Sequence, residues 1–286
     1  IMTRSSFNIL IIGDLMLDEF SYFSFSKNSP ESDCKVYKLD NQKFEIGGAG
    51  NLAISVNNVF SKCEFVGILG QDIYSDKIKE CFSSNRIKSK LFIDKNSKNT
   101  FKKRIYINNK QQLRLDNDIK KISKKTYDKF YNFLSKNIDR YSIIFVADYK
   151  KGIINQKLLN LLKKKSKGKF ISIDTKDINI NKFTYMELIK KNYLEYKSIN
   201  NKKIKFKSML ITKSDKGMSY KSNIENKYYS VPGLKVSVKD VSGAGDASMA
   251  CFTYCIYFLK MNYFDSLRVT NILCSYLVTQ NVKLYC

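Results

Sequence analysis

Short apolar runs alternate along this chain with amphipathic segments of helical spacing. The runs that we expect to be strands are 8–12, 65–69, 143–147, 170–173, 186–189 and 209–212. The segments that we expect to be helices are 51–59, 75–83, 124–136 and 156–165. Strands and helices that alternate in this way form a mainly parallel sheet covered by helices on both faces. The pattern therefore predicts a doubly wound α/β fold.

Two stretches depart from this alternation, at about 20–43 and 100–116. Both contain short alternating patterns, such as those at 35–39 and 104–107, which are typical of antiparallel strands. We expect them to form a small β lid on the main sheet. The chain has only two prolines and no linker-like segment, so residues 1–286 are expected to form a single domain.

A glycine-rich turn opens the last apolar helical run, which extends from 247 to 259. Gly243 and Gly245 flank Ala244, and Asp246 follows at once. Glycines let a ligand approach the backbone closely, and amides at a helix N-terminus bind anions. A carboxylate is a poor phosphate ligand, so Asp246 indicates a general base for a hydroxyl that attacks a bound phosphoryl group. The alternative is an ordinary turn with Asp246 as a helix cap, and this segment alone does not decide.

Other polar residues stand where strands end or helices begin. Asp14 and Asp148 follow expected strands, and ligands of parallel sheets bind at the carboxyl ends of strands. Asn51 follows the Gly47-Gly48 pair, where its amide could fix sugar hydroxyls. The alternatives are a turn residue at Asp14 and a helix cap at Asn51.

The net charge of +25 raises the question of a nucleic-acid ligand. Only six of the 51 basic residues are arginines, and the lysines are scattered over the whole chain. Bidentate readers of phosphates and bases are usually arginines, so we interpret the lysines as a solvated surface and expect no nucleic-acid partner.

Histidine is absent, so any proton transfer must use Asp, Glu, Lys, Tyr or Cys. This strengthens the case for Asp246. The seven cysteines include no C-x-x-C pair, and Cys251 and Cys255 are expected to be buried thiols. No apolar run reaches the roughly 20 residues that span a bilayer, and the N-terminus leads almost directly into the first strand. We therefore expect a cytoplasmic protein without a membrane segment.

The order of the motifs along the chain resembles the ribokinase family of sugar kinases from end to end. Within that family it is most similar to the kinase modules that act on D-glycero-β-D-manno-heptose 7-phosphate. The segments that carry the resemblance, in addition to 240–246, are 13–18, 29–31, 47–51, 111–116, 148–152, 192–195 and 212–217.

The resemblance implies an ATP- and Mg²⁺-dependent kinase and assigns roles to residues of this chain. The catalytic group is Asp246 with the amides of Gly243, Ala244 and Gly245. The substrate-binding residues are Asp14, Gly47, Gly48, Asn51, Arg104, Gln111 and Asp148. The nucleotide-binding residues are Asn192, Thr212, Ser214, Gly217 and Asn271, and Glu195 binds the metal through water. Taken alone, Asn192 and Glu195 also fit a helix capping box.

The implied reaction phosphorylates the anomeric hydroxyl of heptose 7-phosphate to the 1,7-bisphosphate, for lipopolysaccharide core assembly. Lys102, Arg104 and Arg114 are the lid cations expected to meet the far phosphate, with a solvated strand face as the alternative for each. The resemblance also implies a homodimer formed through the lid. The alternatives are a kinase for another sugar, sugar phosphate or nucleoside, and a non-catalytic sugar-binding derivative.

Three departures from the family pattern affect these expectations. Ser242 replaces the usual threonine, and 196–207 is too short for the helix that normally follows Glu195. The sequence also stops at Cys286, before the Gly-rich segment that completes the nucleotide pocket and before any fused nucleotidyltransferase module. We therefore expect an open base pocket and poor selectivity among nucleoside triphosphates.

Overall fold

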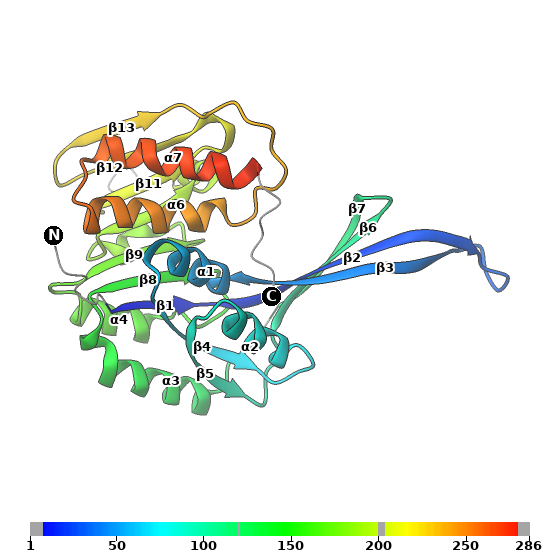
Figure 1. Ribbon diagram of the computed structural model, residues 1–286. Helices are drawn as coiled ribbons and strands as arrows, with labels where there is room; N and C mark the ends of the chain where they lie inside the picture. Colours follow the sequence, from blue (N-terminus) through cyan, green and yellow to red (C-terminus); the bar gives the residue numbers. More distant parts are fainter. Residues whose placement is uncertain (1–7, 119–120, 200–203, 280–286) are drawn as a thin grey trace.

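A nine-stranded sheet forms the body of the protein (Figure 1). The computed structural model describes residues 8–118, 121–199 and 204–279. The strands follow the order β13-β12-β11-β10-β9-β8-β1-β4-β5 across the sheet. Their bounds are β1 Ile9–Gly13, β4 Glu64–Gly70, β5 Lys88–Asp94, β8 Ile143–Asp148, β9 Phe170–Thr175, β10 Leu188–Asn192, β11 Ser208–Thr212, β12 Met218–Ser222 and β13 Lys227–Val231. All pairs are parallel except those of β12 with β11 and β13, so the mainly parallel sheet is confirmed.

Helices cover both faces of this sheet, as the alternating pattern predicts. One face carries α1 (Ala49–Phe60), α2 (Ser75–Ser84), α6 (Ala244–Thr253) and α7 (Tyr263–Thr279). The other carries α3 (Lys124–Asn137) and α4 (Gln156–Lys164). Each face buries its own apolar cluster, because strands covered on both sides present hydrophobic side chains in both directions.

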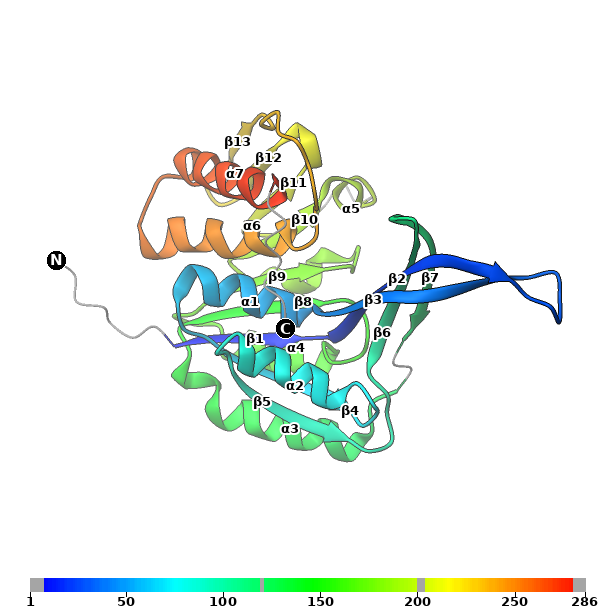
Figure 2. The same cartoon turned by 45° about the vertical axis from the view of Figure 1, so that its right-hand side comes forward.

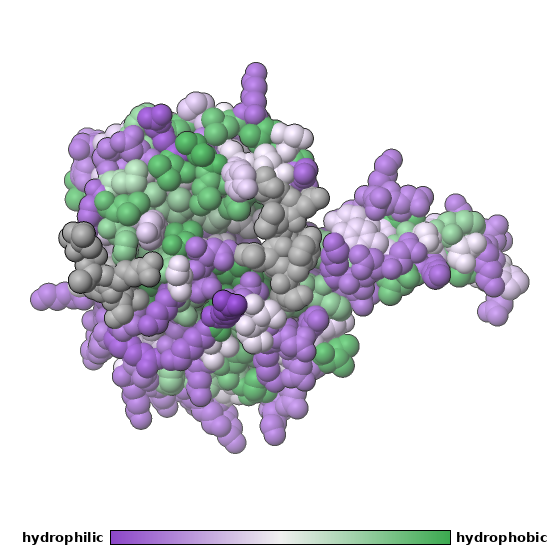
Figure 3. Space-filling view, in the orientation of Figure 1, coloured by the Kyte–Doolittle hydropathy of each residue, from purple (hydrophilic) through white to green (hydrophobic). Residues whose placement is uncertain are grey.

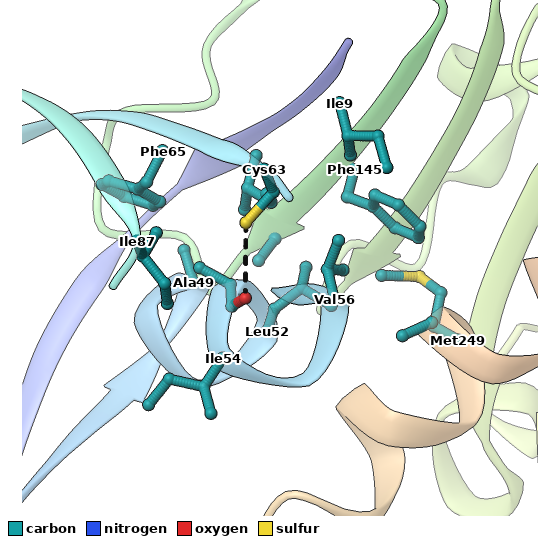
Figure 4. Packing of buried hydrophobic residues seen from close by; sticks show 14 of the residues in the cluster. Ile9, Ala49, Leu52, Ile54, Val56, Cys63, Phe65, Ile87, Phe145 and Met249 are labelled. Atoms are coloured by element: carbon teal, nitrogen blue, oxygen red, sulfur yellow. Dashed lines mark hydrogen bonds between the residues drawn. The ribbon is translucent and has the colours of Figure 1, made fainter. Parts of the chain in front are cut away.

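The packing of α1 shows how the first face is built (Figure 4). Leu52 and Val56 are fully buried beside Phe145 of β8, and Met249 reaches them from α6. The Cys63 thiol lies 3.6 Å from the Ala53 carbonyl oxygen, which ties the helix to the start of β4. Helix α1 is thereby held between the sheet and α6.

A second sheet of four strands forms the lid, in the order β3-β2-β6-β7. Its strands are β2 (Leu15–Asn28), β3 (Lys35–Gly48), β6 (Thr100–Ile107) and β7 (Lys110–Asn117). The β2–β3 hairpin extends far from the body (Figures 1 and 2). The lid is longer than the expected segments, since β2 begins and β3 ends inside the apolar core.

One departure from the predicted elements concerns the bounds of β10. We expected a strand at 186–189, but it spans Leu188–Asn192. The pattern failed because Lys190 and Lys191 are both buried in this strand, and lysine is rarely buried without a partner. The apolar pattern also did not indicate β5, β12, β13 or the full extent of α7. As expected, the helix after Asn192 is short: α5 covers only Tyr193–Lys197.

The surface is divided between apolar and polar regions (Figure 3). Hydrophobic side chains gather over α6 and α7, where Phe264, Val269, Ile272 and Tyr276 are exposed, whereas hydrophilic side chains cover much of the lower half of the view. In the described part of the chain, no helix is long and apolar enough to cross a membrane.

Candidate active site

A cavity of about 430 Å³ lies where the lid meets the body. The lid contributes one wall, α1 and α7 contribute another, and the turn before α6 closes the inner end. Among its lining residues are Met16, Asp18, Phe20, Glu45, Gly47, Gly48, Asn51, Lys102, Arg104, Tyr149, Asp240, Ser242, Gly243, Asp246, Leu273 and Leu277. Six predicted catalytic and substrate-binding positions therefore converge on one space: Gly47, Gly48, Asn51, Arg104, Gly243 and Asp246.

Two helices begin at this cavity, and each follows a glycine with a positive φ. Gly48 precedes α1 with a φ of 59°, and Gly243 precedes α6 with a φ of 76°. Neither helix has a side-chain hydrogen bond at its N-cap. Both N-termini face the lid side of the molecule (Figures 1 and 2). Their positive dipole ends therefore favour an anion at the inner end of the cavity.

Asp246 lies between these two helix starts, in the first turn of α6. The Asn51 side-chain amide donates a 2.8 Å hydrogen bond to its Oδ2. Its Oδ1 is buried and has no hydrogen-bond partner among the described residues. Burial raises the pKa of Asp246 to about 7, against the opposing charge of Lys190. A carboxylate in the cavity wall that is fixed by one hydrogen bond and has its other oxygen unpaired is suited to accept a proton from a hydroxyl.

The β2 strand adds a cavity residue that the sequence-based assignment missed. Met16, Asp18 and Phe20 alternate along β2 and all line the cavity. Asp18 Oδ1 forms a 2.5 Å ion pair with Arg104 Nη1, and the central carbon of the guanidinium lies 5.1 Å from the centre of the Phe20 ring. Which side chains of β2 face the cavity depends on how the strand is positioned against the core. The Gly13–Asp18 motif alone does not give this position.

Asp14 and Asp148, in contrast, do not line the cavity. The Asp14 carboxylate accepts hydrogen bonds from the backbone amides of Tyr149, Lys151 and Ile153. Burial raises its pKa to about 6. Asp148 accepts from the Thr175 hydroxyl and from the Lys150 amide. Both carboxylates therefore hold the loop that places Tyr149 in the cavity wall, and a direct sugar contact remains a prediction for each.

Asn192 and Glu195 form the capping box that was the alternative to a ligand role. The Glu195 amide donates to Asn192 Oδ1 at 2.9 Å, and the Asn192 amide donates to Glu195 Oε2 at 3.0 Å. Glu195 Oε1 pairs with Lys176. The structure thus gives both residues a structural task, and their nucleotide and metal roles stay predictions.

The other predicted nucleotide-binding residues surround one turn near the carboxyl ends of β10 and β11. Thr212 pairs with Asn192 in the β10–β11 register. Ser214 and Gly217 have φ values of 53° and 84°, and the Gly217 amide donates to the Ser214 carbonyl at 3.2 Å. The Asn271 amide donates to the Pro232 carbonyl at 2.8 Å. These four residues lie together but outside the cavity beside Asp246.

The remaining predicted residues are more dispersed. Ala244 and Gly245 belong to the first turn of α6 beside Asp246, although they do not line the cavity. Gln111 is exposed on β7, where it accepts a hydrogen bond from the Tyr106 hydroxyl. Arg114, also on β7, pairs with Asp116. The outer lid strand therefore does not reach the cavity in this arrangement.

Comparison with known proteins identifies the group to which this architecture belongs. A family model described as "pfkB family carbohydrate kinase" matches residues 7–281. The chain belongs to the pfkB family of carbohydrate kinases. This confirms the resemblance to sugar kinases, and the protein is a phosphotransferase with an alcohol group as acceptor.

Several curated relatives of this pfkB kinase carry the name bifunctional protein HldE. That of Aliarcobacter butzleri is 33% identical over 156 residues, which are 53% of this chain and 32% of that protein. That of Campylobacter fetus is 29% identical over 288 residues, which cover 93% of this chain and 61% of that protein. The chain thus spans less than two thirds of the length of these relatives.

Solved structures confirm the ribokinase-like fold. Phosphofructokinase-2 from Escherichia coli in complex with substrates and products has a TM-score of 0.75 and is 13% identical, covering 98% of this chain and 95% of that chain. The same enzyme in complex with potassium gives a TM-score of 0.77 at 14% identity, with coverage of 98% and 95%. At such identities the likeness concerns the fold alone.

Proposed function

We propose that this pfkB kinase transfers the γ-phosphoryl group of ATP to the anomeric hydroxyl of D-glycero-β-D-manno-heptose 7-phosphate. The observation that carries the chemistry is Asp246, a buried carboxylate at a helix start without a side-chain cap, with one oxygen that has no hydrogen-bond partner among the described residues. The choice of sugar rests on the motif order and on the HldE relatives. ATP and sugar phosphates are cytoplasmic metabolites, so the proposal places the protein in the cytoplasm.

The proposed step balances with Asp246 as the only proton acceptor. The anomeric O–H bond breaks as the proton moves to the Asp246 carboxylate. The anomeric oxygen forms a bond to the γ-phosphorus, and the bond from that phosphorus to the β–γ bridging oxygen breaks to release ADP. Amides and the positive end of α6 stabilise the charge on the transferring group. Asn51 keeps the carboxylate in the correct orientation through its 2.8 Å hydrogen bond.

The nucleotide would extend from α6 toward the turn that holds Thr212, Ser214, Gly217 and Asn271, with Asn192 beside its phosphates. The described residues contain no group of three or more acidic or cysteine side chains that could hold a metal. A Mg²⁺ ion would therefore be bound mainly by phosphates and water, which suits its preference for retained waters, with Glu195 as an outer partner. Such an ion would neutralise phosphate charge.

The sugar phosphate would extend from Asp246 toward the lid. Lys102 and Arg104 are the cations that line the cavity on that side. Asp18 fixes the guanidinium of Arg104 against Phe20, so this cation is already oriented before a ligand arrives. We assign Arg104 to the distal phosphate and Asp18 to the sugar hydroxyls, together with the predicted contacts of Gly47, Gly48 and Asn51.

The direct test is ADP release over a panel of sugars and sugar phosphates, with heptose 7-phosphate among them. We expect heptose 7-phosphate to give the highest kcat/KM and the product to be the 1,7-bisphosphate. A higher kcat/KM for a different sugar phosphate would overturn the choice of substrate but not the kinase assignment.

The lid contact has its own test, in which Arg104→Ala is compared with Arg114→Ala. Loss of a charge-assisted hydrogen bond should raise the KM for a phosphorylated sugar roughly 10-fold or more, with less effect on the dephosphorylated analogue. Arg114 is exposed and outside the cavity, so its replacement is the matched control and should leave both KM values unchanged. Equal effects of Arg104→Ala on the two substrates would assign Arg104 to lid structure only.

We also propose that two copies pair through the lid. Phe25, Leu39, Leu113 and Leu115 are exposed apolar side chains on lid strands. Light scattering of Phe25→Asp and Leu39→Asp should show a shift from dimer to monomer. Ile224→Asp, at an exposed position outside the lid, is the control and should leave the mass unchanged. A parent protein that is monomeric at micromolar concentration would overturn the proposal.

A further inference from the structure

A buried lysine lies directly behind the glycine-rich turn. Lys190, on β10, is 7% exposed, and its ammonium is 2.7 Å from Asp174 Oδ2 on the neighbouring strand β9. A Cβ atom on Gly245 would lie 2.8 Å from Lys190 Nζ. The ammonium therefore packs against the backbone of the first turn of α6.

Lys190 is accompanied by two buried carboxylates. Asp174 and Asp246 each have one buried oxygen without a hydrogen-bond partner within the described residues. Burial works against the charge of Lys190, but Asp174 and Asp246 together raise its pKa above the ordinary value. The lysine is therefore charged at neutral pH, and two carboxylates compete for one ammonium.

The surroundings of Asp246 come from four elements. Asn51 on α1 donates a hydrogen bond to it, and Lys190 on β10 and Lys176 after β9 favour its charged form. Asp174 on β9 disfavours the charged form, and burial disfavours it most. Tyr149, from the loop after β8, stays neutral because burial raises its pKa. Asp240 and Arg104 also line the cavity.

The two glycines of the turn each leave room for one neighbour of this carboxylate. A Cβ on Gly243 would be 2.9 Å from Asn51 Nδ2, just as a Cβ on Gly245 would meet Lys190 Nζ. Asn51 acts on Asp246 by a hydrogen bond, whereas Lys190 acts by its charge. Gly243 thus makes room for Asn51, and Gly245 makes room for Lys190.

We propose that Lys190 is a positioning residue that keeps the buried base Asp246 ionised, and that position 245 is glycine because the Lys190 ammonium occupies the space of a side chain. The inference rests on the kinase function proposed above, in which Asp246 accepts the proton. Asp174 has the opposite electrostatic effect, because it shares the same ammonium and adds a negative charge nearby.

The test compares the acid limb of kcat/KM against pH in four variants. Lys190→Met should move the acid limb to higher pH by about one unit or more, because the positive charge that lowers the pKa of Asp246 is removed. Asp174→Asn should move the acid limb to lower pH, because Asp246 is then the only one of the two carboxylates that interacts with the Lys190 ammonium. Gly245→Ala should move it up, because the new methyl group displaces the flexible end of Lys190 while the backbone stays as it is.

Lys191→Met is the matched control. Lys191 is the next residue of β10 and is also buried, but its ammonium donates to the backbone carbonyls of Thr175 and Asp177 instead. Its replacement removes a buried charge from the same strand and should leave the acid limb in place. Shifts of the same sign in Lys190→Met and Asp174→Asn, or an equal shift in Lys191→Met, would overturn the proposal.

A second measurement keeps the inference independent of the substrate. The rates are taken with any sugar phosphate that supports turnover, so loss of the heptose assignment leaves the test intact. If Lys190→Met does not fold or no sugar phosphate is turned over, the carboxyl ¹³C titration of Asp246 in Asp174→Asn, Gly245→Ala and Lys191→Met gives the answer. Its pKa should fall, rise and stay unchanged in that order, and any other order contradicts the proposal.

Discussion

Two helices begin at the carboxyl ends of neighbouring parts of the sheet, and they are built in opposite ways. Helix α5 begins with a complete capping box, in which Asn192 and Glu195 satisfy each other's backbone amides. Helix α6 begins at Gly243 with no side-chain cap, and it carries a buried carboxylate with one oxygen that has no hydrogen-bond partner in the described part of the chain. The first start is complete in the protein alone, whereas the second leaves donors and an acceptor for a ligand.

The difference shows that a local motif and a site are separable. N-x-x-E and G-A-G-D both fit a helix cap in the sequence, and only the surroundings distinguish them. Asp246 is flanked by Asn51 and by the charge of Lys190, from elements far away in the chain. Function is therefore expected to depend strongly on the start of α6 and weakly on the start of α5.

The largest expected effect is that of Asp246→Asn. The change keeps the shape and the Asn51 neighbour but removes the proton acceptor, so turnover should fall roughly 10²-fold or more. Sugar binding, measured by calorimetry, should change little. Turnover within a few-fold of the parent would remove Asp246 from the catalytic role and with it the contrast between the two helix starts.

Acidification should reproduce much of this loss in the parent protein. The pKa of Asp246 is raised from 3.8 to about 7, mainly by burial. Below that pH the base is protonated, so kcat/KM should fall by about tenfold per pH unit. A rate profile that is flat between pH 5 and 8 would contradict this.

The raised pKa of Asp246 also makes the stability of the fold depend on pH. A raised pKa means that the folded state binds the proton more tightly than the unfolded state. The stabilisation is fully present below about pH 4 and is lost as the pH rises through about 7. Asp246→Asn should therefore raise Tm at pH 8 but not at pH 4, and equal changes at both values would show that the carboxylate is not buried as described.

An intermediate effect is expected for Gly243→Ala. A φ of 76° costs an alanine about 1–2 kcal/mol, and the new methyl group would press on Asn51 Nδ2. We expect Tm to fall and turnover to drop about tenfold, because Asn51 would lose its hold on Asp246. Asn51→Ala removes the same hydrogen bond without straining the backbone at position 243 and should give a similar loss of turnover. A normal rate in both variants would show that this hydrogen bond is not needed.

The smallest effects belong to α5. Asn192→Ala removes a helix cap and should cost about 1 kcal/mol of stability. Glu195→Gln keeps the capping-box geometry, so it should leave Tm nearly unchanged. A rise in the KM for MgATP in Glu195→Gln alone would therefore report the proposed metal role, whereas an unchanged KM would leave Glu195 with the cap only.

The fold was predictable because its information is local. The apolar runs gave β1, β4 and β8, and helical spacing gave α1, α3 and α4 within a few residues. The Gly-Ala-Gly-Asp turn was predictable for the same reason, since the required residues are contiguous. Local patterns fail at β10, where two lysines interrupt the apolar run because their partners lie on other elements.

The site was less predictable because its contacts are long-range. The sequence predicts a sugar contact for Asp14, and that contact stays a prediction. What the sequence did not show is that the Asp14 carboxylate accepts hydrogen bonds from amides more than 130 residues away. Asp18 was passed over because the register of β2 against the core decides which side chains face the cavity. No pattern within the Gly13–Asp18 motif distinguishes one aspartate from the other.

The β2 strand is buried in its first half and exposed at its far end. Leu15, Met16 and Leu17 are buried at the start of the strand, whereas Phe25 is exposed close to its far end. Its pairing with β3 changes register between Tyr22 and Phe23, and bulges of this kind are where a strand bends. Bending would therefore move the outer arm and leave Asp18 and Phe20 in place. A small sugar that reaches only these residues would bind with the arm in any position, and only a longer ligand would sense the arm at all.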